Sequence, residues 1–137
     1  MYTTGEAGSV VKFVTTSTGT GSAFDDDKAR VTLPTATNGS GEIPAGVLLC
    51  DVVDKDLTQV HLNHHKREVN VGSKVAILRR GMIVTNKLAN VNPSPGAPAY
   101  FDAQGLFSTV STNSTRVGTF LGGKSSDGYV KVSVNLM

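Results

Sequence analysis

The chain has 137 residues, 39% of them hydrophobic, which suits one domain with one core and excludes two full domains. It contains 18 Val, 15 Thr, 12 Ser and 15 Gly but only 18% charged residues, a composition typical of strands joined by turns. The formal net charge of +2 is too small to indicate a specific nucleic-acid partner. The single cysteine, Cys50, excludes an intramolecular disulfide and a multi-cysteine zinc site.

No apolar run approaches the ~18 residues of a membrane helix, and the first residues lack a basic and then hydrophobic leader. We therefore expect an unprocessed protein made in a cytoplasm, with no membrane partner.

The charge is uneven along the chain. Residues 1–56 carry a net charge of −4 and residues 57–87 a net charge of +5. These opposite halves favour head-to-tail packing of copies, in which the acidic part of one meets the basic part of the next.

Residues 1–28 are rich in Thr, Gly and Ser, contain few large apolar side chains and end with three aspartates before Lys28. Such a segment predicts an N-terminal arm or long loop that becomes ordered only against a partner. We expect residues 29–137 to form a single β domain. Residues 10–15 nevertheless have strand character, and so do residues 29–33.

Residues 47–53 are almost wholly apolar, which predicts a central strand covered on both faces, with Cys50 as a buried thiol. Residues 58–62 alternate between apolar and polar side chains and indicate another strand. A short helix within residues 51–71 is the alternative, because that window contains neither Gly nor Pro.

Three further runs predict a meander with turns at residues 72–73 and 79–81; they are residues 68–71, 74–78 and 82–85. Residues 106–110 indicate one more strand.

The end of the chain shows the strictest alternation. From 129 to 136, one face carries Val130, Val132, Val134 and Leu136, and the other carries Lys131, Ser133 and Asn135. Residues 116–121 indicate a preceding strand, and Asp127-Gly128 is a favoured hairpin corner. We therefore expect residues 116–121 and 129–136 to pair antiparallel. The whole pattern predicts an all-β protein, a compact antiparallel β-barrel or sandwich with a flexible N-terminal arm.

Residues 118–125 match the phosphate-binding pattern G-x-x-x-x-G-K-[ST] in every position. That chemistry needs a strand before the loop and a helix after it, whose N-terminus faces the phosphates. Here the first half of the match is itself a strand, and Asp127-Gly128 and another strand follow. A hairpin loop is therefore favoured over nucleotide binding.

Two clusters of possible metal ligands lack the required spacing. On a strand, His61 and His65 would share a face while His64 points away, which favours a solvated strand end over a zinc site. The aspartates at 25–27 and at 51, 54 and 56 do not form a calcium-loop pattern and suit a solvated or partner-facing loop. We expect no metal, no cofactor and, because no catalytic trio is indicated, no enzymatic activity.

Residues 57–87 are basic and include Lys66, Arg67, Arg79 and Arg80. A nucleic-acid surface is one interpretation. No aromatic residue lies between Ala29 and Ala99, so stacking platforms for single strands are missing there. Contacts with another protein are favoured.

Several segments together resemble the small all-β decoration (cement) proteins of tailed-bacteriophage heads. The resemblance covers about residues 41–136, is strongest after Ala97, and rests on residues 41–47, 71–81, 98–102, 105–109, 116–121 and 127–134. The closing cadence is the most similar part, with a V-G-x-x-L run at 117–121 and D-G-x-V-x-V at 127–132.

The resemblance implies a non-enzymatic virion protein that binds the assembled shell of major capsid protein, often as a trimer, and stabilises the phage head. We expect the arm to dock on the shell through Tyr2, Phe13 and Phe24. Subunit contacts are expected at Lys66, Arg67, Arg79 and Arg80. The alternative function is a carbohydrate- or receptor-binding β module of a tail or fibre, although the chain has no Trp and only 6% aromatic residues.

Overall fold

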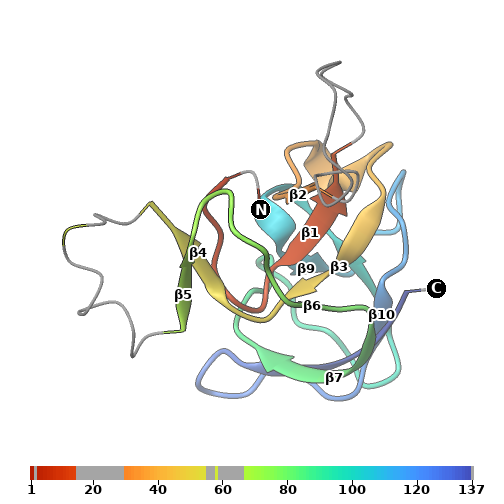
Figure 1. Ribbon diagram of the computed structural model, residues 1–137. Coiled ribbons are helices and arrows are strands. Elements are labelled where there is room, and N and C mark those ends of the chain that lie inside the picture. The colour runs from red at the N-terminus through yellow and green to blue at the C-terminus, as the bar shows by residue number, and fades with distance from the viewer. Residues whose placement is uncertain (2, 15–29, 55–57, 59–66, 137) are drawn as a thin grey trace.

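Strands form nearly all the regular structure of the protein, as seen in a computed structural model (Figure 1). The structure describes residues 1, 3–14, 30–54, 58 and 67–136. In chain order the strands are β1 (Val10–Phe13), β2 (Val31–Thr32), β3 (Pro44–Leu48), β4 (Asp51–Val53), β5 (Glu68–Asn70), β6 (Ile77–Leu78), β7 (Arg80–Thr85), β8 (Pro98–Phe101), β9 (Phe107–Ser108), β10 (Gly118–Phe120) and β11 (Val130–Asn135). Two short 3-10 turns, η1 (Thr37–Gly39) and η3 (Ala103–Gly105), complete them.

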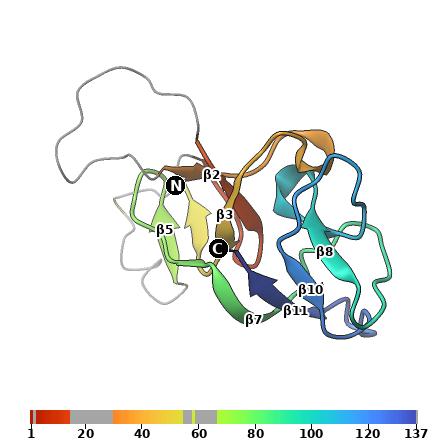
Figure 2. The ribbon, with the colours of Figure 1, turned by 90° about the vertical axis from the view of Figure 1, so that its right-hand side faces the viewer.

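The strands form two sheets and a small ribbon. One sheet has four strands in the order β2-β1-β3-β6, the other has five in the order β7-β11-β10-β8-β9, and β4 pairs with β5 alone. Figure 2 shows the ribbon and the five-stranded sheet on opposite sides of the four-stranded sheet. Both large sheets are antiparallel, while β4 and β5 are parallel. The predicted all-β class is confirmed.

β11 lies between β7 and β10, and its side chains alternate as the sequence predicted. Val130, Val132 and Val134 are at most 2% exposed, whereas Lys131 and Asn135 are exposed. β10 pairs antiparallel with β11, with Thr119 opposite Ser133. The predicted C-terminal hairpin is therefore confirmed.

The interior consists of two clusters of apolar side chains. The larger one lies under the five-stranded sheet and contains Val10, Val47, Ala99, Phe101, Phe107, Val117, Phe120, Val130, Val132 and Val134. Within it, the rings of Phe107 and Phe120 meet edge to face, with centroids 6.4 Å apart and planes at 70°. The smaller cluster lies under the four-stranded sheet and contains Met1, Val11, Val31, Ala45, Leu48 and Val52.

β1 connects the two clusters, because Val10 packs into one and Val11 into the other. The strand expected at residues 10–15 is present over Val10–Phe13, hydrogen-bonded between β2 and β3. Its successive side chains reach both interiors, because they point to opposite faces of the strand. Residues 15–29 lie outside the described residues, so an arm in that part of the chain stays a prediction.

Two predictions about the middle of the chain are wrong. The strand expected over residues 47–53 is divided, because the chain turns at Leu49 and Cys50 and Leu49 is 49% exposed. The expected meander is absent: β5 pairs with β4, β6 with β3 and β7 with β11. None of the three pairs with another of the three, because each joins a different sheet or the ribbon. The strand expected at 58–62 lies outside the described residues, apart from Thr58.

Close backbone contact joins the 3-10 turns to the sheets. Gly105 in η3 has φ +76°, and a Cβ there would overlap the carbonyl oxygen of Val10 on β1. Gly39 in η1 has φ +61°, and a Cβ there would overlap the buried ring of Phe101. Both positions therefore require glycine, for conformation and for space.

A partly buried ion pair holds β1 to the loop before β3. Lys12 contacts Glu42, whose Oε1 also accepts hydrogen bonds from the backbone N–H groups of Thr35 (3.1 Å) and Ala36 (3.3 Å). The Glu42 side chain is 9% exposed. Burial by itself raises the pKa of this carboxyl group, but the hydrogen bonds and Lys12 outweigh it, and the pKa of Glu42 lies below its usual value.

The aromatic contact in the larger cluster yields a stability prediction. Phe120→Ala removes a fully buried ring and leaves a cavity beside Phe107, so the free energy of unfolding should fall by about 3–5 kcal/mol. Urea unfolding followed by circular dichroism measures the change. Leu49→Ala, at a position that is 49% exposed, is the control and should cost well under half as much. Equal losses in the two variants would contradict the described core.

Glu42 yields a pH prediction. Because its folded-state pKa lies below the ordinary value of 4.5, the carboxylate stabilises the fold above that pH, and the contribution is lost as the pH falls through the folded-state pKa. Glu42→Gln should therefore lower the unfolding free energy by about 1–3 kcal/mol at pH 7 and by progressively less as the pH falls below 4.5 and through the folded-state pKa. Denaturant titrations at several pH values measure the difference, with Asp54→Asn as an exposed control. A pH-independent difference would show that ionisation of Glu42 does not matter.

Candidate functional site

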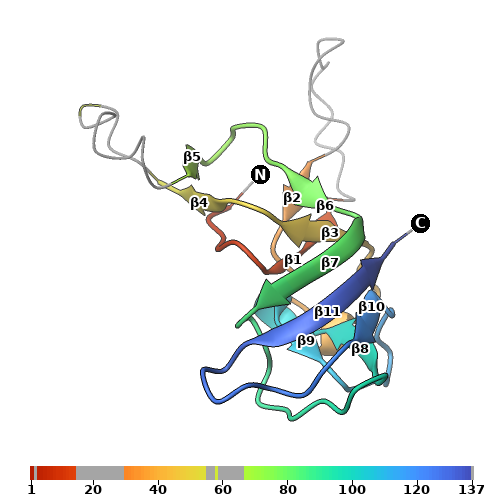
Figure 3. The same ribbon diagram turned by 90° about the horizontal axis from the view of Figure 1, so that it is seen from below.

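The outer face of the five-stranded sheet carries large apolar side chains in solvent. On β7, Met82 is 77% and Val84 is 59% exposed. Tyr129 is 45% exposed just before β11, and Leu121 is 46% exposed just after β10. Figure 3 shows β7 and β11 in front when the molecule is viewed from below. We call Arg80, Met82, Val84, Leu121, Tyr129, Lys131 and Ser133 the β7–β11 face.

Local alternation produces this face. In β7 the residues Gly81, Ile83 and Thr85 turn inward, so the side chains between them turn outward. The register then sets Met82 opposite Ser133 and Val84 opposite Lys131. The apolar side chains are therefore adjacent to a cation on the same surface.

The charge of this face is positive. Arg80 and Lys131 are exposed, and neither forms an ion pair within the part of the chain that the structure describes. Several acidic side chains elsewhere have intramolecular partners: Glu6 pairs with Lys87, Glu42 with Lys12, and Asp51 accepts a hydrogen bond from the Ala7 N–H at 2.7 Å.

The structure brings two of the sequence-predicted site residues together. The guanidinium carbon of Arg79 lies 5.9 Å from the centroid of the Phe13 ring, a cation–π distance. Phe13 ends β1 and packs against the smaller core cluster, so its ring belongs to the domain. Arg79 stands between β6 and β7, and its neighbour Arg80 lies on the β7–β11 face.

The other predicted site residues are placed apart or not described. Arg67 is exposed at φ +53° just before β5. Figures 1 and 2 show β5 apart from β7. Tyr2, Phe24 and Lys66 lie outside the described residues, so their expected role in docking stays a prediction.

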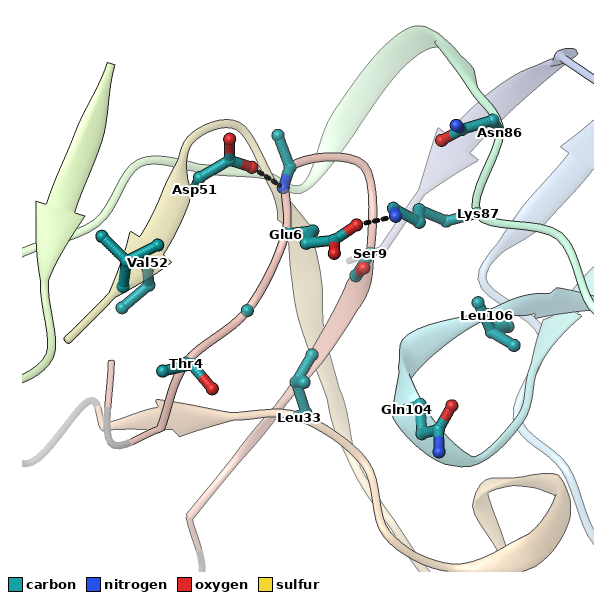
Figure 4. Close-up of a pocket in the computed structure, with 13 residues that line it drawn as sticks. Thr4, Glu6, Ser9, Leu33, Asp51, Val52, Asn86, Lys87, Gln104 and Leu106 are labelled. Carbon is teal, nitrogen blue, oxygen red and sulfur yellow. Dashed lines mark hydrogen bonds and ion pairs between the residues drawn. The ribbon is translucent and has the colours of Figure 1, made fainter. Parts of the chain in front are cut away.

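A cavity of about 730 Å³ lies where residues 4–9 meet β4 and the segment around η3 (Figure 4). The Glu6–Lys87 ion pair joins two of its walls, and Asp51 on a third is bonded to Ala7. Thr4, Ser9, Asn86 and Gln104 add further polar groups. Since its charged side chains are paired with one another or with backbone, the cavity is a polar junction between sheets and presents no paired catalytic groups among these lining residues.

The structure also shows what the other sequence motifs form. The segment that matches the phosphate-binding pattern forms β10 and the start of the loop to β11, with no helix between them, so its interpretation as a hairpin is confirmed. Among the described residues, no group of three His, Cys, Asp or Glu side chains is placed to hold a metal ion. No helix in the same residues is long and apolar enough to cross a membrane.

Sequence reasoning missed the apolar half of the β7–β11 face. The strand at 82–85 was predicted, and the alternation of Met82, Ile83 and Val84 gives no polar side to that strand. Nothing in such a run shows which face is buried. The sequence signal is a strand with apolar side chains on both faces, and its place at the edge of the sheet comes only from the structure.

Comparison with known proteins identifies the family. Residues 1–135 match the family described as "Structural cement protein (E217 gp24/Pam3 gp6)". No curated protein and no solved structure matches the chain. The match spans both sheets and the ribbon, and it agrees with an all-β domain that presents an exposed apolar and basic sheet face. The chain therefore belongs to the structural cement protein family of bacteriophages.

Proposed function

We propose that this protein binds the assembled shell of major capsid protein on the virion surface and stabilises the phage head by adding contacts between neighbouring subunits. The observation that carries the proposal is the family match over residues 1–135. A cement role needs surface adhesion and no chemical step, so the protein is proposed to act without catalysis.

The exposed surface supports this role. Met82 and Val84 lie on the same face of β7 and together form an exposed apolar patch, whereas an isolated exposed side chain would not. Such patches mark interaction sites. Exposed arginines beside them provide charge-assisted contacts, which favour a protein partner with carboxylates.

Stabilisation would come from repetition. Each copy contributes a modest contact, and the contact recurs at every equivalent position of the shell. A trimer would multiply it further, because three linked copies engage several subunits at once and the second contact becomes intramolecular. The trimer is proposed from the resemblance of the sequence to decoration proteins.

The first test mixes purified protein with expanded, undecorated heads and counts bound copies after sedimentation. Saturable binding at a fixed ratio to the capsid subunits is expected, together with a higher temperature of head disruption. Fully decorated heads are the control and should bind no more. A stable monomer that remains in the supernatant would contradict the proposal and favour a receptor-binding module, which a glycan array would then examine.

Ionic strength provides the second test. Because Arg79, Arg80 and Lys131 are exposed, shell binding should weaken between about 50 mM and about 500 mM salt, where exposed charge pairs are screened. Solution mass is measured across the same range, and a trimer of the 14.3 kDa chain would give about 43 kDa. Binding and mass that do not change with salt would exclude charge pairing as the main contact, both with the shell and between copies.

A further inference from the structure

We propose that β7 is the docking strand for the shell, and that its free edge accepts an extended, acidic segment of the capsid subunit as an added antiparallel or parallel strand. This inference rests on the proposed function and deepens it, because it names the surface, the mode of recognition and the chemistry of the partner.

The first argument is the free backbone of β7. The strand stands at the end of the five-stranded sheet, with β11 as its hydrogen-bonded neighbour. The Leu136 N–H donates to the Arg79 carbonyl at 2.8 Å, and the register continues from Gly81 opposite Val134 to Thr85 opposite Val130. In an antiparallel ladder alternate residues bond to the same neighbour, so the N–H and C=O groups of Arg80, Met82 and Val84 point away from β11.

Nothing in the described chain occupies that edge. No backbone hydrogen bond joins Arg80, Met82 or Val84 to another of the described segments. Their side chains are exposed as well, with Met82 at 77%. Natural proteins protect free edges with lysines, prolines, bulges or a covering loop. β7 contains no lysine and no proline. Its pairing with β11 is regular over six residues, so it has no bulge.

The second argument is the chemistry around the edge. A strand added beside β7 would lie next to Met82 and Val84, whose apolar side chains would cover its alternate residues. Arg80 stands at one end of β7, and Lys131 lies opposite Val84 toward the other. With two cations and no carboxylate on the β7–β11 face as defined above, charge complementarity favours an acidic partner.

A second copy of this chain could also pair with the edge of β7, but its described residues offer few acidic side chains for that contact. Of the four acidic side chains described in residues 1–56, Glu6, Glu42 and Asp51 already have partners within the molecule, which leaves only Asp54. Among the described strands, β7 is the only exposed edge with the required length and side chains. Pairing β7 with β7 of another copy would bring together two faces that each carry Arg80 and Lys131 and no carboxylate. The shell is therefore the occupant to which the proposal commits.

The main test compares binding of variants to undecorated heads. Met82→Pro removes an outward N–H that β11 does not use, so the sheet should persist while strand addition is blocked. We expect its dissociation constant to rise about tenfold or more, because a central hydrogen bond and its neighbours are lost. Met82→Leu keeps the backbone and the apolar side chain and should bind like the wild type. Ile43→Lys, 56% exposed before β3, is the control for a surface change elsewhere.

The acidic character of the partner is tested separately. Arg80→Glu with Lys131→Glu should abolish most of the salt-dependent binding, whereas Lys74→Glu with Lys124→Glu, the same change of charge at exposed positions outside the face, should not. Equal losses in both double variants would show that only net charge matters and would overturn the acidic-segment assignment.

Hydrogen–deuterium exchange on the wild type keeps the proposal testable even if a variant fails to fold. Fragments from 79–86 should gain protection of alternate amides on binding to heads, while the β4–β5 ribbon should not. If wild-type protein fails to bind at all, the proposed function is wrong. If it binds but β7 exchange and all β7 variants are unchanged, the docking strand is wrong and the function stands. If free protein self-associates and Met82→Pro makes it monomeric, β7 joins copies of this chain and the shell assignment is overturned.

Discussion

The burial of one side of β11 is the constraint on which the structure depends. Its three inward valines are almost completely covered, and they close the larger cluster that Phe101, Phe107 and Phe120 fill. Because β11 lies in the interior of its sheet, it uses alternate backbone groups for β10 and for β7. Fixing β11 therefore fixes both neighbours, and it also determines which residues of β7 face solvent.

The two sheets are joined by continuous backbone and by shared side chains. β6 ends at Leu78 and β7 begins at Arg80, so the chain passes from one sheet to the other at Arg79. At this corner the Arg79 guanidinium lies over Phe13 at the end of β1. At the start of β1, Gly105 allows η3 to approach Val10. The docking face proposed for β7 is thus anchored directly to the smaller core cluster, which gives it a rigid base for adhesion.

A cement protein must hold its own shape while leaving adhesive groups exposed. The described chain separates these tasks by location. Ion pairs such as Lys12–Glu42 and Glu6–Lys87 connect segments within the domain, where carboxylates neutralise nearby cations. The β7–β11 face keeps its cations and its apolar side chains for solvent or a partner. This division explains how a chain with a formal charge of only +2 presents a distinctly basic surface.

The sequence by itself determined the all-β class, the C-terminal hairpin and the alternation of β11, because these depend on local periodicity and turn residues. It also indicated the cement family and the basic character of Arg79 and Arg80. Only the tertiary structure decided that Val47 to Val53 is divided at Leu49, that β5, β6 and β7 pair with separate partners, and that Val10 and Val11 belong to two cores. Strand pairing is set by apolar surfaces that meet from distant parts of the chain. A run such as Met82-Ile83-Val84, apolar on both faces, cannot reveal which face the rest of the molecule covers.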